Sequence, residues 1–289
     1  MPGYEVIGAE EQAQINDIFA RGGVLFRHGF DALRNDCYKV REFESAFAAY
    51  MKVPHALAVT SGTAALRVAL AALDLRPGDE IITQSFTFVA TAEAIIEARA
   101  TPVCCEVDAT LNMDPVDLER RITERTRAVI AVHMLGTPAR LREISAVCDR
   151  HKLVLIEDAA WGCGGSLDGR ALGTWGRMGT YSFDFAKTMT TGEGGMIVFR
   201  DKRDYERAAA WHDHGHENNP AVPRWRHSFR QRLQLSHERT ARCGRSRPIE
   251  ETRRCRASPA HQPRRAVASD IGSSRCDRSG HAEWVARDR

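Results

Sequence analysis

The sequence predicts an α/β fold in which a mostly parallel β-sheet lies between two layers of helices, a three-layer αβα sandwich. Two observations carry this prediction for residues 1–225. Short apolar runs of strand length alternate with helical patterns of about ten residues, which is typical of βα units. The chain has 289 residues, of which 43% are hydrophobic and 27% are charged, so it has the length and composition of a globular protein with a substantial core.

The individual elements follow from periodicity and turn residues. Apolar side chains at helical spacing predict an amphipathic helix over residues 38–50. The turn from Arg76 to Asp79 precedes an apolar run and predicts a strand there, and Pro115 suits the first position of a helix. The predicted strands are 56–60, 80–83, 101–107, 128–133, 153–156 and 196–199. The predicted helices are 38–50, 63–73, 88–98, 115–122 and 140–150.

The last part of the chain differs in composition from the rest. Residues 226–289 hold 16 Arg, no Lys and 7 acidic residues, a formal charge of +9, so residues 1–225 carry −6 of the net +3. Hydrophobic periodicity stops after Trp225. We therefore expect a large domain over residues 1–225 and an aberrant, Arg-rich and disordered tail over residues 226–289.

Several classes of protein are excluded by what the sequence lacks. There is no apolar run of about 18 residues, so no membrane-spanning helix is expected. The first 20 residues contain four acidic residues and do not resemble a signal peptide. The eight cysteines form no C-x-x-C pair and have no zinc spacing. We expect a cytoplasmic protein with reduced thiols and no contact with a membrane.

One histidine cluster is a candidate metal site. His212, His214 and His216 alternate along the chain, and imidazole is a good ligand for zinc or nickel. Their spacing would bring three ligands together only on a strand, whereas Gly215 and the segment 218–220 favour a loop. We therefore predict that the protein binds no metal.

The segment from Ser61 to Thr63 joins a predicted strand to a predicted helix. Free backbone N–H groups, the helix dipole and two hydroxyl groups suit a phosphate at such a position. A helix N-cap alone would also explain these residues, because serine and threonine are favoured there. Both interpretations remain open from the residues alone.

Three further residues complete a possible cofactor site. Asp158 follows the most apolar strand, where it could cap a helix, hold a metal or pair with a cationic ring. Lys187 lies between an apolar strand and a glycine-rich turn, where it is either a solvated surface lysine or a Schiff-base lysine. Phe88 starts a predicted helix as a core residue or a stacking partner. Together with the phosphate segment, these groups fit pyridoxal 5'-phosphate (PLP).

At this point the sequence resembles the DegT/DnrJ/StrS family of sugar aminotransferases. The resemblance covers roughly residues 10–225, and the GEGG turn after Lys187 is its most specific feature. Four runs carry it, namely TSGTAAL (60–66), PGDEIITQSFTFVAT (77–91), VLIEDAAWGCGG (154–165) and YSFDFAKTMTTGEGGMIV (181–198).

The resemblance implies an aspartate-aminotransferase-like PLP fold of type I and a homodimer. It implies that Lys187 forms the Schiff base and serves as the general base and acid, and that Asp158 contacts the pyridine nitrogen. Trp161 replaces the Gln or His that usually follows EDAA beside the cofactor's O3′. The other expected cofactor contacts are Ser61, Gly62, Thr63, Phe88 and Ser182.

The family also implies a reaction. Its members transfer an amino group, typically from glutamate, to a keto group of a nucleotide-activated sugar for polysaccharide or glycosylated-metabolite synthesis. Related sugar dehydratases carry histidine in place of the lysine, so Lys187 favours transamination. The alternative is a catalytically inactive or regulatory relative that keeps the PLP-binding fold.

The tail is the part that departs from the family, whose members end in a small domain with an Asn-Tyr-Arg-Met run. The genetic code allows a choice of codons for residues 233–245 whose translation in the reading frame shifted by one nucleotide is FNYRMNGLQGAVG, which contains this run. We therefore expect a frameshift near Trp225 that removes the small domain. The +9 charge alone would suggest nucleic-acid binding, but a shifted frame explains it without nucleic acid.

Overall fold

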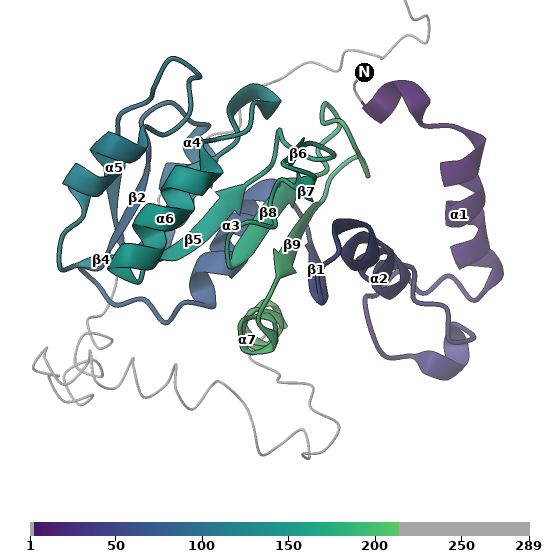
Figure 1. The fold of residues 1–289 in the computed structure, drawn as a ribbon. Coiled ribbons are helices and arrows are strands. Elements are labelled where there is room, and N and C mark those ends of the chain that lie inside the picture. Colours follow the sequence, from purple (N-terminus) through teal and green to yellow (C-terminus); the bar gives the residue numbers. More distant parts are fainter. Residues whose placement is uncertain (1–2, 214–289) are drawn as a thin grey trace, which may run out of the picture. The chain divides into compact units, whose positions relative to one another are not determined.

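The computed structural model describes residues 3–213, and the predicted tail over residues 226–289 lies outside them (Figure 1). Seven strands form one sheet in the order β1-β9-β8-β5-β4-β2-β3, and β6 and β7 form a separate small hairpin. The strands of the large sheet are β1 (His55–Val59), β2 (Glu80–Gln84), β3 (Thr101–Cys105), β4 (Thr126–Val132), β5 (Val154–Asp158), β8 (Met178–Ser182) and β9 (Gly195–Phe199). The hairpin strands are β6 (Ser166–Leu167) and β7 (Arg170–Ala171).

Seven α-helices and three short 3₁₀ helices lie in the described part of the chain. The α-helices are α1 (Ala9–Ala20), α2 (Lys39–Met51), α3 (Gly62–Ala71), α4 (Val89–Glu97), α5 (Pro115–Arg121), α6 (Leu141–His151) and α7 (Lys202–His212). The 3₁₀ helices are η1 (Gly3–Val6), η2 (Asp31–Leu33) and η3 (Met134–Gly136). None of these helices is long and apolar enough to span a membrane.

The direction of the strands decides where a site can form. Strands β3, β2, β4, β5 and β8 are parallel, and β9 is antiparallel to both of its neighbours, β8 and β1. It follows that β1 runs in the same direction as the parallel group. The carboxyl ends of six strands therefore meet at one edge of the sheet, where ligands bind in open α/β folds.

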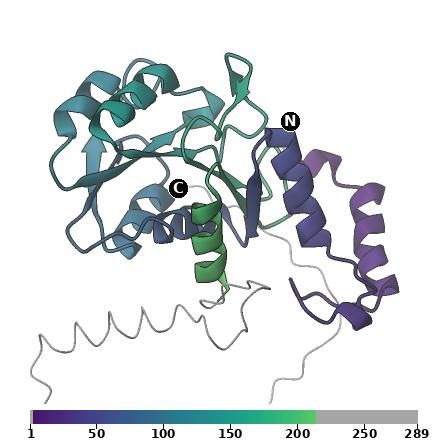
Figure 2. The ribbon, with the colours of Figure 1, turned by 60° about the horizontal axis from the view of Figure 1, so that its bottom comes forward.

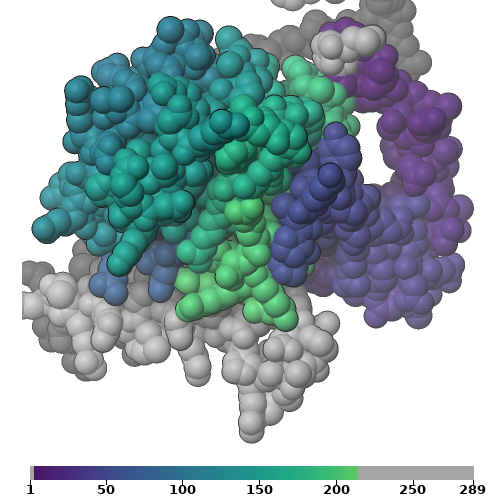
Figure 3. Space-filling model, in the orientation of Figure 1, coloured from purple at the N-terminus to yellow at the C-terminus, as the bar shows by residue number. Residues whose placement is uncertain are grey.

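The helices cover both faces of the sheet. Residues of α3, α4 and α7 share one hydrophobic core with Ile156 of β5 and Ile197 of β9. On the other face, α6 packs over Leu155, and α2 packs over Val198. Figure 2 shows the sheet between these layers, and Figure 3 shows the blue-to-teal part of the chain, which includes α5 and α6, on the near face of the molecule. The prediction of a three-layer α/β fold is confirmed.

Candidate active site

The segment after β1 makes the turn that was predicted to hold a phosphate. The Ser61 side chain caps α3, because its Oγ accepts a hydrogen bond of 3.1 Å from the backbone N–H of Ala64. Gly62 lies against the end of β8, where a Cβ added to it would stand 2.7 Å from Cβ and 3.1 Å from Oγ of Ser182. The capping role of Ser61 is therefore observed, and Ser182 lies beside the start of α3.

The carboxyl group of Asp158 is buried at the end of β5. Its Oδ2 accepts a hydrogen bond of 3.2 Å from Thr91 Oγ1, and its Oδ1 accepts one of 3.1 Å from the backbone N–H of Ala160. No basic side chain of residues 3–213 lies within 4.0 Å of this carboxyl group. Burial therefore raises the pKa of Asp158, and the two hydrogen bonds only partly oppose it.

Lys187 lies in the loop between β8 and β9, half-buried at the same edge of the sheet. Its Nζ stands 3.6 Å from the centroid of the Trp161 ring. Burial lowers the pKa of Lys187, while the negative charges of Asp158 and Asp184 act in the opposite direction. Asp158 and Lys187 thus lie on neighbouring elements, as predicted, because β5 pairs directly with β8.

The backbone of Lys187 is held from two sides. Its N–H donates a hydrogen bond of 2.9 Å to the carbonyl of Asp184, and its carbonyl accepts one of 2.7 Å from the N–H of Gly3. The ring of Tyr4 stacks on Phe185 with 4.8 Å between centroids. The start of the chain therefore packs against the loop that carries the lysine.

The two aromatic candidates differ in their surroundings. Trp161 follows β5 and contacts the Lys187 amine with its ring face. Phe88 is the residue before α4, and 65% of its surface is exposed. Thr91, one turn further along α4, is the residue that reaches Asp158. The structure brings Trp161, Asp158 and Lys187 together and leaves Phe88 exposed at the start of the adjacent helix.

Sequence reasoning missed two residues that support this edge. One is Thr91, which donates to the Asp158 carboxyl group. The other is His133, whose backbone N–H donates a hydrogen bond of 3.0 Å to the carbonyl of Asp158. His133 directly follows strand β4, so its position at the carboxyl edge of the sheet is the signal that could have found it.

The His133 ring is part of a buried network. Its Nδ1 accepts a hydrogen bond from the N–H of Ala139, so Nε2 carries the proton and donates to Glu157 at 3.0 Å. The Glu157 carboxylate also accepts hydrogen bonds from the N–H groups of Gly173 and Gly176. This network holds the end of β5, and with it the backbone of Asp158, in place.

The alternating histidines, which were weighed as a metal site and not predicted to bind metal, lie mostly outside the described residues. His212 ends α7, whereas His214 and His216 lie outside the described residues. Within residues 3–213 no group of three or more potential ligands is arranged to hold a metal ion.

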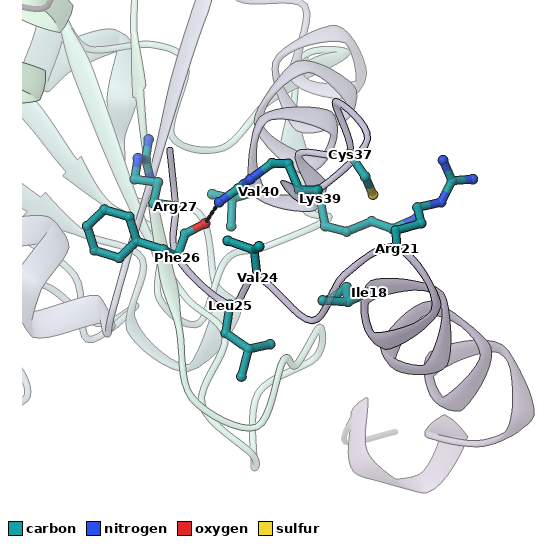
Figure 4. A pocket seen from close by; sticks show the side chains of 10 residues that line it. Ile18, Arg21, Val24, Leu25, Phe26, Arg27, Cys37, Lys39 and Val40 are labelled. Atoms are coloured by element: carbon teal, nitrogen blue, oxygen red, sulfur yellow. Dashed lines mark hydrogen bonds between the residues drawn. The ribbon is translucent and has the colours of Figure 1, made fainter. Parts of the chain in front are cut away.

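A separate small pocket lies beside the start of α2, with a volume of about 90 Å³ (Figure 4). Basic side chains line it, but Arg21 and Lys39 both pair with Asp17, and Arg27 pairs with Glu44. None of the predicted site residues lines this pocket. We therefore place the candidate active site at the carboxyl edge of the sheet.

Comparison with known proteins identifies the family. A family model described as the DegT/DnrJ/EryC1/StrS aminotransferase family matches residues 30–244. The chain belongs to this family. The predicted family is thus confirmed, although the match begins later than residue 10 and continues beyond Trp225. Aminotransferases of this family depend on PLP.

Two curated relatives and two solved structures illustrate the similarity. The chain is 38% identical over 200 residues to a GDP-perosamine synthase from Vibrio cholerae, covering 68% of this chain and 52% of the relative. It is 43% identical over 178 residues to the spore coat polysaccharide biosynthesis protein SpsC from Bacillus subtilis, covering 61% of this chain and 46% of the relative.

An aminotransferase structure from Psychrobacter cryohalolentis matches with a TM-score of 0.69 at 33% identity, covering 76% of this chain and 56% of that one. The structure of 3-amino-5-hydroxybenzoic acid synthase matches with a TM-score of 0.69 at 33% identity, covering 78% of this chain and 57% of that one. The chain spans about half the length of the curated relatives it matches.

Proposed function

We propose that this chain is a PLP-dependent aminotransferase that moves an amino group, in the first instance from glutamate, to a keto group of a nucleotide-activated sugar. The observation that carries the proposal is the placement of the Lys187 amine and the buried Asp158 carboxyl group at one edge of the sheet. Family membership supports the reaction class. Relatives named GDP-perosamine synthase support the sugar substrate.

The residues at this edge fit the cofactor. A buried carboxyl group without a cationic partner suits a protonated ring nitrogen, because that cation would offset the cost of burying the negative charge. The start of α3 and the hydroxyl groups of Ser61, Thr63 and Ser182 suit a phosphate group. The close approach of Gly62 to Ser182 leaves no room for a side chain there.

PLP, when bound, supplies an aldehyde and a ring that accepts electrons from the α-carbon of an amino acid. In our proposal, Lys187 provides the amine that attaches the cofactor and then carries the proton to and from the reacting carbon. Burial lowers its pKa, so a larger fraction of the amine is neutral and able to accept that proton.

The remaining residues orient these two groups. The hydroxyl of Thr91 fixes the Asp158 carboxyl group, and we assign the ring face of the cofactor to Phe88. We assign Trp161 to the position beside the Lys187 amine. At this place in the sequence, directly after EDAA, the family resemblance implies Gln or His.

Cofactor attachment is the test of this proposal. PLP added to the purified full-length chain should give the visible absorbance band of an imine, and borohydride reduction should leave the cofactor mass on the peptide that contains Lys187. Lys187→Ala should lose both signals. Lys202→Ala is the matched control, because Lys202 is exposed and forms an ion pair with Glu206, away from the predicted site residues. A wild-type chain that gives no band, or a label on another lysine, would overturn the proposal.

A second candidate function is an inactive relative that keeps the cofactor-binding fold. The observation that favours it is Trp161, which stands where the family usually carries the Gln or His beside the cofactor. Addition of glutamate to the PLP-loaded chain separates the two candidates. Conversion to the pyridoxamine form supports an enzyme, whereas an unchanged spectrum supports a scaffold.

The gene sequence across codons 215–245 tests the proposed frameshift near Trp225.

We also propose that the chain forms a homodimer through its N-terminal segment. Five large apolar side chains between residues 19 and 33 are exposed, by 57 to 74% of their surface, and the rings of two of them, Phe26 and Phe30, lie 6.1 Å apart. Exposed apolar side chains that gather in one segment support an interface there. The five are Phe19, Leu25, Phe26, Phe30 and Leu33. Leu25→Asp should raise the dissociation constant measured by sedimentation, whereas Val116→Asp on α5 should leave it unchanged. Equal dissociation constants would refute this interface.

The proposed location is the cytoplasm. The five cysteines of the described part are free of disulfide bonds, which is typical of a reducing compartment. A nucleotide-activated sugar and an amino-acid donor, the proposed partners of the reaction, are also small molecules of that compartment. Fractionation of cells that express the tagged chain tests this location.

A further inference from the structure

The Lys187 amine lies on an aromatic face. Its Nζ stands 3.6 Å from the centroid of the Trp161 ring, within the range of a cation–π interaction. The other three such pairs of the described part have distances of 4.1 to 5.0 Å, and all of them involve arginine. The contact with Trp161 is therefore the shortest of its kind in residues 3–213.

Two chain segments are needed to make this contact. Trp161 lies in the turn after β5, and Lys187 lies in the loop after β8. The pairing of β5 with β8 brings the segments together, and the hydrogen bond from the N–H of Ala159 to the carbonyl of Thr180 extends that pairing toward the turn. The backbone of the fold thus sets the indole beside the lysine.

The charged groups around the amine do not replace this contact. Asp158 and Asp184 are the carboxyl groups that act electrostatically on Lys187. Neither forms an ion pair within 4.0 Å of Nζ, and Asp158 is held by Thr91 and Ala160 instead. Within residues 3–213, the ring face of Trp161 is consequently the group in direct contact with the ammonium.

We propose that Trp161 is a positioning residue, whose indole face binds the Lys187 ammonium and holds the amine at the carboxyl edge of the sheet. This inference rests on the proposed function, since it concerns the lysine to which we assign cofactor attachment. The attraction applies only to the charged form, because a neutral amine has little interaction with the ring quadrupole. When the ammonium loses its proton to solvent, the indole releases the neutral amine, which is the nucleophilic form.

The size of the effect follows from the strength of cation–π contacts. Removal of the ring should lower the pKa of Lys187 further, because the contact with the ring stabilises only the charged form of the amine. At a pH well below the titration, the fraction of neutral amine then rises roughly 2.5- to 30-fold.

Competitive labelling with acetic anhydride measures this shift on the full-length chain without cofactor. Peptide mass spectrometry gives the labelling rate of Lys187 against pH, with Lys202 as the reference in the same sample. Trp161→Leu should show the lowered pKa, and Trp161→Phe, which keeps a ring face, should recover part of the shift. Trp175→Phe is the matched control, because the Trp175 ring lies by Arg170 and not by Lys187.

The pH profile separates a bound ammonium from simple shielding. If Trp161 only covers the amine, Trp161→Leu raises the plateau rate at high pH and leaves the pKa unchanged, and that result overturns the proposal. Far-UV circular dichroism checks that each variant is folded.

Fluorescence of the wild-type chain gives a test that needs no tryptophan variant. The emission should change with pH as Lys187 titrates, and Lys187→Met should abolish this component. Emission that is independent of Lys187 overturns the proposal even if Trp161→Leu fails to fold. Both measurements are made without PLP, so a chain that fails to form the imine band loses its proposed function but not this contact.

Discussion

The contact between Gly62 and Ser182 allows a stability prediction that can be worked out from distances. In Gly62→Ala the new Cβ would stand 2.7 Å from Cβ and 3.3 Å from Cα of Ser182. Carbon atoms in contact are separated by about 3.5–4.0 Å, so the overlap is close to 1 Å. Cα belongs to the backbone and Cβ is bonded directly to it, so rotation of a side chain cannot relieve the clash.

Overpacking of this kind costs about 1–3 kcal/mol, which corresponds to a fall in melting temperature of about 2–12 °C for a domain of this size. A double-mutant cycle tests the cause, because Ser182→Gly removes the opposing Cβ. The double variant should regain most of the stability that Gly62→Ala loses, a coupling of at least about 1 kcal/mol. Urea unfolding of the four chains provides the free energies.

Gly8→Ala is the control substitution, because the nearest atom to its added Cβ is a carbonyl oxygen at 3.9 Å. It should change the unfolding free energy by no more than about 1 kcal/mol, the range for loss of a glycine cap. If Gly62→Ala were as stable as the wild type, or if Ser182→Gly restored nothing, the start of α3 would not lie against the end of β8.

Three further predictions follow from the described contacts. Burial raises the pKa of Asp158 in the folded state above its value in the unfolded state. The contribution of the Asp158 side chain to folding stability is therefore most favourable below the unfolded-state pKa, and it is lost as pH rises through the folded-state pKa. Asp158→Asn should therefore stabilise the chain by about 1–3 kcal/mol at pH 7 and by less at pH 4, measured by urea unfolding; an equal gain at both pH values would contradict this. Gly3→Val places a Cβ 3.0 Å from the Lys187 carbonyl oxygen and should therefore speed hydrogen exchange in the loop 184–191. The free energy of global unfolding should change by no more than about 0.5 kcal/mol. An unchanged exchange rate would show that the N-terminus does not restrain the loop. Arg177→Met leaves the buried Asp204 without its ion pair and should cost roughly 3 kcal/mol while PLP binding is retained; a loss below about 1 kcal/mol would mean that Asp204 finds another partner.

Periodicity predicted most of the sheet and its covering helices. The strands and helices that were given predicted bounds begin and end within about two residues of them, in keeping with the usual uncertainty of element ends. No bounds were predicted for β8 or for the short hairpin strands β6 and β7. Helices α1 and α7 were not predicted. Helix α1 has no buried residue and α7 buries only Asp204, Ala208 and Ala210, so neither carries the wide apolar stripe that a periodicity argument needs.

The candidate site was predictable where its residues carry unusual chemistry. A lysine before a glycine-rich turn and an aspartate after an apolar strand are rare enough to be noticed in a sequence. Thr91 was missed because its importance comes from a hydrogen bond to Asp158 across 67 residues of chain, and a threonine near the start of a helix is ordinary by itself. His133 was missed for the same reason, since its contacts depend on strand pairing.

The same buried carboxyl group links stability to the proposed function. Among residues 3–213, Asp158 receives hydrogen bonds only from neutral donors, which leaves the cost of burying its charge largely unbalanced. A structural role alone would be filled better by asparagine, whose oxygen accepts from the N–H of Ala160 and whose NH2 group can donate to Thr91 Oγ1, without a buried charge. A carboxylate at this position is useful only if a cation binds beside it, and the Lys187 ammonium is turned toward Trp161 instead. The destabilising charge is therefore best explained by a cationic ligand, and a protonated pyridine ring has the shape and charge to serve.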